Sequence, residues 1–470
     1  MDDRNQKPLW SELLNRALLP KLITLCMAVW LHASNSMLTA TTMPSAIAEI
    51  GGFSLISWTF ALYLAGSIAS AASVGFVVNK HGFQHTMAGF ACVYVVGCIA
   101  VASAPLMSWL LVGRLTQGVG GGALIALVYI AQERFFPSRL IPKTVGLVSV
   151  IWTMAALSGP TIGGAFATYG SWRWAFWSFA IQGVLLIPAV YYLLSGGEKS
   201  NPQVAGKIPI FRIGFLCSAI LLFSLSGVNY TNVGSPLMVL AGCVALALFI
   251  ARDRRSNTNK IFPSAASDIQ SPMANGLVAT FILSLSIMSF LVYGPFILIN
   301  LYDLSPLQAG FVVLVESLAW GFAAISLSGV MEQNEPRLIR TGSAIVFIGL
   351  GLMAIAFPLV SLWFVVFAAI FLNFGMGMMW GYIIKRLVAA APAEDKGRAS
   401  SMLPITQQTG FALGAALSGL IANGLGLSDN SDATIIKTAA FWLFAGFLPL
   451  ALLGNVFAWR FTSSKFLKNE

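Results

Sequence analysis

Long apolar runs recur along the whole chain, and short polar segments separate them. A helix needs about 20 mostly apolar residues to cross a lipid bilayer. Backbone N–H and C=O groups find no water in lipid, so such runs must pair internally and are predicted to be helical. We predict fourteen spans, at residues 21–45, 54–78, 85–104, 108–132, 144–169, 174–195, 211–228, 235–251, 274–299, 307–330, 341–359, 361–384, 400–425 and 437–460.

The polar segments divide these spans into groups. The longest ones, at about 196–210 and 252–273, flank the seventh and eighth spans. This arrangement predicts an N-terminal six-helix bundle at 1–195, cytoplasmic linkers with a two-helix insert at 196–273, and a C-terminal six-helix bundle at 274–470. The seventh and eighth spans are the shortest, so twelve spans is the alternative. The predicted fold class is therefore an all-α integral membrane protein with two pseudo-symmetric halves.

Basic residues alternate between the two sides of the predicted spans. With the N-terminus inside, nearly all Lys and Arg residues of the connecting segments lie inside, and only Arg173 and Lys437 lie outside. Positive residues near membrane spans mark the cytoplasmic side. The polar start, Met1–Leu19, does not resemble a cleavable signal peptide. We therefore expect an inner-membrane protein with both termini in the cytoplasm.

Composition excludes several classes of protein. Only 9% of the 470 residues are charged, against roughly 25% in soluble domains. The net charge of +10 is spread over short connections, with no basic stripe and interleaved aromatics, so no nucleic acid is expected. No phosphate-cradling GxxxxGK[ST] loop, catalytic triad or His/Cys metal cluster is present. We expect no enzyme activity, no cofactor and no metal, and we expect the five cysteines to be buried small hydrophobes.

Two glycine-rich segments point to helices that pack closely and move. Gly159, Pro160, Gly163 and Gly164 lie inside the predicted fifth span. A helix with proline and several glycines can bend, and a neighbouring helix can approach its bare face. Gly410–Ala416 in the thirteenth span is a weak internal echo of this run. Two related six-helix halves around a central cavity is a transporter plan.

Four motifs in order carry a family resemblance. They are Gly75–His85 between the second and third spans, Arg114–Gly120 in the fourth, the Gly-Pro run in the fifth, and Trp172–Trp177 at the start of the sixth. Together they resemble the major facilitator superfamily, and specifically its fourteen-helix drug:proton antiporter branch. The resemblance covers nearly the whole chain and implies secondary transport by alternating access.

The resemblance also implies roles for particular residues. It places an inner-face gate at Gly75, Asn79, Lys80 and Gly82, a bending element of exporters at Gly159, Pro160, Gly163 and Gly164, and a polar site tied to proton coupling at Arg114 and Gln117. Two positions depart from the family pattern, because Asn35 and Asn79 stand where carboxylates are expected. An amide keeps its hydrogen bonds but cannot titrate. These departures bear on both the proton site and the usual preference for cationic drugs.

Three ionisable side chains at membrane depth are candidates for proton coupling. They are Glu316 near the middle of the tenth span, Arg114 in the fourth and His32 near the middle of the first. A charge at the bilayer centre costs at least ~2.5–3.5 kcal/mol, so each is a functional hypothesis by default. The alternatives are a structural carboxyl, an arginine that holds backbone carbonyls, and a histidine that serves packing.

Polar and aromatic residues inside the spans are candidates for the substrate cavity: Asn35, Thr39, Gln117, Trp380 and Gln407. The polar side chains of the first span either line a cavity or bond neighbouring helices. The Met-rich and aromatic stretch around Trp380 either forms an adaptable wall for bulky cargo or simply packs.

These observations predict a monomeric, proton-coupled exporter of a small amphipathic drug-like compound or metabolite, surrounded by membrane lipid. One alternative is an importer of a siderophore or other organic anion, with Arg114 as the anion's partner. An alternative of another class is a membrane sensor or partner subunit that transports nothing.

Overall fold

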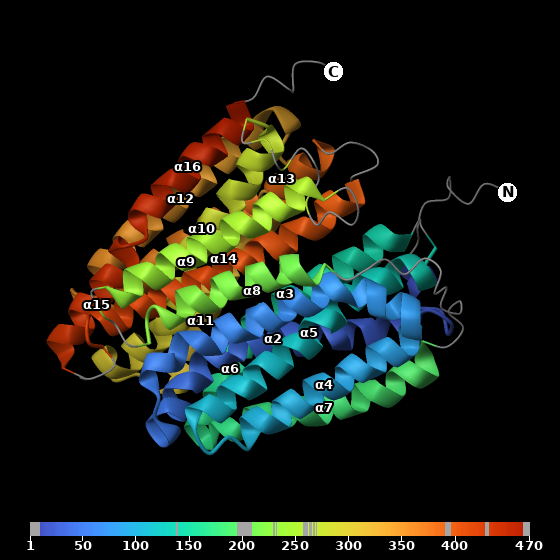
Figure 1. Cartoon of the computed structure of the whole chain (residues 1–470), viewed down its shortest axis with the longest axis horizontal. Coiled ribbons are helices and arrows are strands. Elements are labelled where there is room, and N and C mark those ends of the chain that lie inside the picture. Colours follow the sequence, from blue (N-terminus) through green and yellow to red (C-terminus); the bar gives the residue numbers. More distant parts are fainter. Residues whose placement is uncertain are drawn as a thin grey trace. The chain divides into compact units, whose positions relative to one another are not determined.

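The structure is a computed structural model, and its elements are α-helices joined by short connections (Figure 1). It describes residues 10–137, 140–194, 209–228, 231, 233–256, 262, 266, 268, 270–390, 396–427 and 432–463. The chain divides into two compact units. Unit 1 comprises Met1–Gly51 and Leu62–Pro209, and unit 2 comprises Gly52–Ala61 and Ile210–Glu470.

Unit 1 holds the first group of helices. They are α1 (Trp10–Leu13), α2 (Leu19–Ile50), most of α3 (Ile56–His81), α4 (Phe83–Ala102), α5 (Met107–Phe135), α6 (Ile141–Tyr169) and α7 (Trp172–Leu193). Within this unit α2 packs against α5, α6 and α7, and α4 packs against α5 and α7. Helix α2 thereby brings its polar residues to the interior of the unit.

Unit 2 holds the second group. Its helices are α8 (Ile210–Leu225), α9 (Gly234–Arg255), α10 (Pro272–Tyr302), α11 (Pro306–Ser326), α12 (Glu335–Ala356), α13 (Leu362–Ala389), α14 (Lys396–Gly424), α15 (Ala433–Ala445) and α16 (Leu448–Ser463). Two 3-10 turns, Phe53–Leu55 and Glu332–Asn334, also belong to it. Helix α10 packs against α14 and α16, α12 against α13 and α16, and α11 against α13. Helices α10, α12 and α16 run side by side (Figure 1).

The helix pairs of unit 1 recur in unit 2. The pairs α2–α6, α4–α5 and α4–α7 correspond in chain order to α10–α14, α12–α13 and α12–α16. Glycines make the close approach in both α2–α6 and α10–α14. A Cβ added at Gly163 would lie 2.6 Å from Thr41 Oγ1 on α2, and one at Gly410 would lie 2.6 Å from the carbonyl oxygen of Phe281 on α10. The echo between these two glycine runs therefore corresponds to equivalent helix contacts.

Twelve helices of the described residues are long and apolar enough to cross a membrane. Each of the fourteen predicted ranges coincides with a helix or a helix pair, but two of these helices fall outside the twelve. Helix α8 has only 16 residues, and the continuous helix α14 contains the polar residues Gln407 and Gln408 near its middle. The chain is an all-helical integral membrane protein, and the predicted number of spans remains a prediction.

Two local expectations need correction. The connection at Gly75–His85 is helical except at Gly82, because α3 continues to His81 and α4 begins at Phe83. The last predicted span, 437–460, lies within one apolar segment of spanning length, Ala433–Ser463, and the chain turns inside it at residues 446–447 between α15 and α16. Of the five cysteines only Cys98 is buried, and Cys92 and Cys243 are exposed on the outer faces of their helices.

Candidate functional site

A fully buried arginine lies among neutral polar groups in unit 1. Nη1 of Arg114 on α5 donates hydrogen bonds to Oδ1 of Asn35 on α2 at 2.6 Å and to Oε1 of Gln117 at 2.8 Å. The guanidinium carbon also lies 4.3 Å from the ring centroid of Tyr63. The three side chains in these contacts, from Asn35, Gln117 and Tyr63, are uncharged. The cluster holds a positive charge with amide dipoles and an aromatic face.

His32 joins the same cluster through Tyr63. The hydroxyl of Tyr63 on α3 lies 2.9 Å from Nδ1 of His32 and also donates to the His32 carbonyl oxygen at 2.9 Å. The two rings stack, and Trp152 of α6 meets the imidazole edge-on. His32 is only 2% exposed. The imidazole is therefore fixed by a hydroxyl and two aromatic rings rather than by solvent.

Glycines on α5 explain how so many side chains meet at Arg114. Cβ atoms added at Gly118 or Gly122 would collide with the backbone of α3 at Tyr63 and Ser67, and one at Gly120 would collide with α4 at Tyr94. Small residues let helix backbones approach closely in membranes. The Arg-x-x-Gln-Gly segment thus combines the polar side chains with the bare faces that let α3 and α4 reach them.

The Gly-Pro run of α6 packs directly onto α2. Helix α6 continues without interruption through Pro160, although a proline cannot donate to the carbonyl one turn earlier. Thr41 Oγ1 donates to the Pro160 carbonyl oxygen at 2.8 Å. Gly159 and Gly163 face Met37 and Leu38 of α2, and Gly164 is buried. Both Asn35 and Thr41 therefore bond neighbouring helices, whereas the Thr39 hydroxyl bonds the carbonyl of Asn35 within α2.

The acid at mid-span, Glu316, lies in unit 2 at the contact between α11 and α13. The side-chain amide of Asn373 on α13 donates to Oε1 of Glu316. Glu316 is 8% exposed and Asn373 is 6% exposed. In the described part of the chain, no ion pair includes Glu316. The carboxyl is thus held by a neutral amide inside an apolar span.

An aromatic pair lies further along the same contact, one helical turn from Glu316 on α11 and two turns from Asn373 on α13. Trp320 follows Glu316 by four residues, so the two lie on the same face of α11. Trp380 follows Asn373 by seven residues, so these two lie on the same face of α13. The two indole centroids are 6.3 Å apart. A Cβ at Gly377 would collide with the backbone of Trp320, so this glycine allows the close approach. Gln407 is half-buried on α14.

The predicted gate residues lie around the α3–α4 junction. Gly82 adopts φ +82°, a left-handed conformation that favours glycine. Lys80 is exposed and Asn79 is half-buried in the last turn of α3. A Cβ added at Gly75 or Gly82 meets nothing within 4 Å. Gly82 is therefore required by backbone conformation, whereas nothing within unit 1 crowds Gly75.

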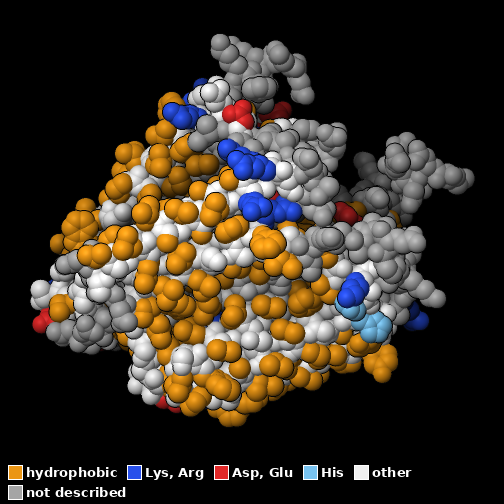
Figure 2. Space-filling model, in the orientation of Figure 1, with side chains coloured by type: hydrophobic (Ala, Val, Ile, Leu, Met, Phe, Trp, Pro, Cys, Tyr) orange, Lys and Arg blue, Asp and Glu red, His pale blue; other side chains and the backbone are white. Residues whose placement is uncertain are grey.

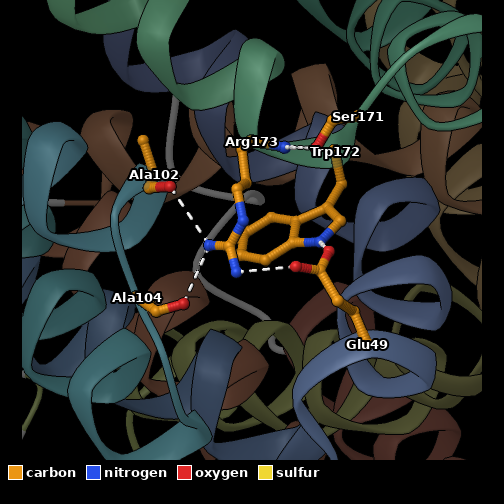
Figure 3. Close-up of polar contacts among 6 residues, drawn as sticks. All are labelled: Glu49, Ala102, Ala104, Ser171, Trp172 and Arg173. Carbon is orange, nitrogen blue, oxygen red and sulfur yellow. Dashed lines mark hydrogen bonds and ion pairs between the residues drawn. The ribbon is translucent and has the colours of Figure 1, made fainter.

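A second polar cluster joins three helix ends of unit 1, and Figure 3 shows its members converging. Arg173 at the start of α7 donates to the carbonyl oxygens of Ala102 and Ala104 at 3.2 and 2.8 Å. It also pairs with Glu49 of α2 at 2.9 Å. Nε1 of Trp172 donates to the other Glu49 oxygen at 2.7 Å. The guanidinium and the indole thus hold one carboxylate from two sides and fasten α2 to α4 and α7.

Three partners in these clusters were not predicted from the sequence: Tyr63, Asn373 and Glu49. Tyr63 and Asn373 lie inside apolar spans, and Glu49 lies at the end of one. A lone amide near the middle of a span, such as Asn373, is a usable signal because buried polar groups need partners. Tyr63 carries no comparable signal, since tyrosine is common at such positions. Of the described residues, no group of three or more His, Cys, Asp or Glu could hold a metal ion.

Comparisons with known proteins agree with this architecture. A family model described as Major Facilitator Superfamily matches residues 25–402. A probable multidrug-efflux transporter of Mycobacterium tuberculosis is 28% identical over 435 residues, which cover 88% of this chain and 89% of that protein. The multidrug efflux pump SdrM of Staphylococcus aureus is 22% identical over 414 residues, covering 85% and 89%.

Solved structures share the fold. The crystal structure of a D-xylose–proton symporter aligns with a TM-score of 0.68 at 15% identity, covering 95% of this chain and 99% of that one. The crystal structure of a peptide transporter, POT, aligns with a TM-score of 0.68 at 15% identity, covering 94% and 95%.

Proposed function

The chain belongs to the Major Facilitator Superfamily and is a transporter rather than an enzyme, and we propose that it exports small amphipathic compounds in exchange for protons. Export is supported by the similarity to relatives named as multidrug-efflux transporters. The observation that carries the proton-coupling part is the buried carboxyl of Glu316, which bonds a neutral amide within a membrane span.

Glu316 suits proton exchange because its surroundings favour the neutral acid without forbidding the carboxylate. Burial in an apolar environment disfavours the charged form. The Asn373 amide bonds a carboxyl oxygen in either protonation state, since it donates to an acceptor that both states possess. A carboxyl with a nearby cation would instead remain ionised. In our proposal Glu316 takes up a proton from the outer side and releases it inside during each transport cycle.

In unit 1, Arg114 contributes a fixed positive charge rather than a titrating group. Asn35 holds the Arg114 guanidinium where the family pattern has a carboxylate, and an amide cannot titrate. Arg114 and Gln117 therefore shape the polar cavity electrostatically. His32 is a second possible proton carrier, because its imidazole titrates near neutral pH in water. Asn35, Thr39, Gln117, Trp380 and Gln407 remain our proposal for residues that contact cargo.

The helix contacts suggest which segments move during transport. We assign the bending element to Gly159, Pro160, Gly163 and Gly164, because α6 touches α2 through bare glycine faces that can slide. Gly75, Asn79, Lys80 and Gly82 form the proposed inner gate. The proposal includes fourteen spans in two six-helix bundles plus the α8–α9 insert, both termini in the cytoplasm, the inner membrane and a monomer.

The proposal is tested by measuring the direction of transport. Cells that express the protein are loaded with ethidium, a fluorescent cation, and its efflux is recorded with and without a protonophore. We expect faster efflux than in cells without the protein, and the protonophore should abolish the difference. Efflux of ethidium, and of a panel of neutral and anionic dyes, at the rate of cells without the protein would contradict export.

Import of an organic anion is the second candidate, and the buried charge of Arg114 favours it. A guanidinium whose nearby partners are amides keeps an electrostatic attraction for an anion. Uptake of fluorescein, an organic anion, in the same cells distinguishes the two functions. Import predicts expression-dependent accumulation of fluorescein and no effect on ethidium.

A further inference from the structure

One face of α16 carries an open, mainly apolar groove on the surface of unit 2. It encloses about 500 Å³ and is lined by Leu452, Asn455, Val456, Trp459, Arg460 and Ser463. These positions recur at spacings of three and four residues or their sums, so they lie on one side of the helix. Leu452 and Trp459 are each 55% exposed. Along the helix axis, the apolar residues Leu452 and Val456 form one end of the groove, and Arg460 and Ser463 form the other.

The length of the groove matches one leaflet of a bilayer. Leu452 and Ser463 are eleven residues apart in sequence, which corresponds to ~16 Å of helix. Half of the hydrocarbon core of a bilayer is about 15 Å. A molecule that fills the groove thus spans the distance from the membrane middle to the headgroup region, as an acyl chain does.

The polar end of the groove presents a positioned guanidinium. Arg340 on α12 donates from Nε to Oγ1 of Thr462 at 2.8 Å and from Nη2 to Oγ of Ser463 at 2.9 Å. Its guanidinium carbon lies 4.4 Å from the ring centroid of Trp459. These contacts hold the charge of Arg340 next to Trp459 and Ser463, which line the groove. The exposed side chain of Arg460 adds a second positive charge to the lining itself.

Among the described residues, no carboxylate lies within ion-pair distance of Arg340 or Arg460. Figure 2 shows Lys and Arg side chains toward the top of the view, with Asp and Glu side chains among them, above a broad hydrophobic surface. By charge placement the end of α16 at Arg460 is the predicted cytoplasmic end, where anionic lipids concentrate and basic pockets between helices bind their headgroups.

We propose that the groove is a binding site for one anionic phospholipid. An acyl chain lies along Leu452 and Val456, and the headgroup phosphate is held by Arg340, Arg460 and Ser463. Trp459 sits at the level of the headgroup, where indole rings are favoured. The lipid bridges α12 and α16. The site goes beyond the transport function and does not depend on the identity of the cargo.

Lipid titration of the delipidated, purified protein tests the proposal. Dioleoyl phosphatidylglycerol or dioleoyl phosphatidylethanolamine is added, and native mass spectrometry counts the lipids retained per chain. We expect one tightly held phosphatidylglycerol and weaker retention of phosphatidylethanolamine. The double variant Arg340→Gln/Arg460→Gln should weaken phosphatidylglycerol binding at least about tenfold, since each basic residue near a membrane surface contributes to this attraction.

The controls distinguish specific binding in the groove from non-specific electrostatic attraction between anionic lipids and basic residues. Arg252→Gln/Arg254→Gln removes two exposed charges from the last turn of α9 and should leave retention unchanged. Arg460→Gln alone alters an exposed side chain, so it should weaken phosphatidylglycerol binding while leaving the unfolding temperature unchanged. Glycerol 3-phosphate, which has a phosphate and no acyl chain, should not displace the lipid. Equal retention of both lipids, an equal loss in the α9 variant, or displacement by glycerol 3-phosphate overturns the proposal.

Discussion

The guanidinium of Arg114 donates a 2.6 Å hydrogen bond to the side-chain amide oxygen of Asn35. Both side chains are fully buried in helices of membrane-spanning length. In these contacts the guanidinium meets the amide dipoles of Asn35 and Gln117 and the aromatic ring of Tyr63. A carboxylate in place of the Asn35 amide would hold the charge more strongly. Unit 1 therefore keeps a permanent positive charge at this depth, and the change of one residue would convert the site into an ion pair.

Asn35→Asp should create that ion pair. Above the pH at which the new aspartate ionises, the carboxylate stabilises the folded protein by ~1.5–3 kcal/mol through a charge-assisted bond, and the gain disappears as acid protonates it. Thermal unfolding in detergent across a pH series measures this effect. Asn35→Leu, which removes the acceptor, should lower the unfolding temperature at every pH. Unfolding of Asn35→Asp that matches the unmodified protein at all pH values would contradict the contact.

Two substitutions at Tyr63 separate its two roles. Tyr63→Phe keeps the ring beside Arg114 but removes the hydroxyl that bonds His32, and it should cost about 1 kcal/mol of stability. Tyr63→Leu also removes the aromatic face and should cost roughly a further 1–2 kcal/mol, because the cation–π contact is desolvated. Chemical denaturation in mixed micelles compares the two variants. Equal losses would show that the ring does not hold the guanidinium.

The close approach of α6 to α2 is tested with a matched pair of glycines. A Cβ at Gly163 would lie 2.6 Å from Thr41 Oγ1 and 2.7 Å from the Leu38 carbonyl oxygen, whereas one at Gly146 on the same helix meets nothing within 4 Å. Gly163→Ala should therefore reduce transport and stability, because backbone atoms must move to admit it. Gly146→Ala should behave as the unmodified protein in both assays. Tolerance of Gly163→Ala would argue against a tight contact here.

The cluster at Glu49 predicts unequal effects for its two charges. Glu49→Gln keeps one acceptor oxygen and loses the hydrogen bond at the other, and the carboxylate it replaces is half exposed, so the loss should stay at about 1 kcal/mol. Arg173→Ala removes the bonds to Ala102, Ala104 and Glu49 together, and it should lower the unfolding temperature further. The reverse order of the two variants in a thermal-unfolding assay would refute this assignment.

The positions of the helices could be predicted from sequence, whereas most contacts between them could not. Hydropathy locates α2 to α7 and α9 to α13 because lipid demands continuous apolar helices. Hydropathy does not show that the polar residues after Val78 continue α3 to His81, nor that the chain turns at residues 446–447 inside one apolar segment.

The candidate sites show the same division. Glu316 stands out in sequence because an acid inside a span is costly. Arg114 and Gln117 were grouped by family resemblance, whereas the bond between Asn35 and Arg114 was not predicted, because 79 residues separate them. Their packing with Tyr63 depends on glycines of α5 whose bare faces are set by the three-dimensional crossing of α3 and α5.

Proton-driven accumulation in proteoliposomes tests the role of Glu316 most directly. Vesicles with an acidic lumen and inverted protein should accumulate ethidium, and Glu316→Gln should abolish this accumulation while ethidium exchange without a gradient continues. The same substitution at Glu49, which lies outside the proposed proton site, serves as the control and should leave accumulation intact. Accumulation by Glu316→Gln at the level of the unmodified protein would contradict proton coupling through this carboxyl.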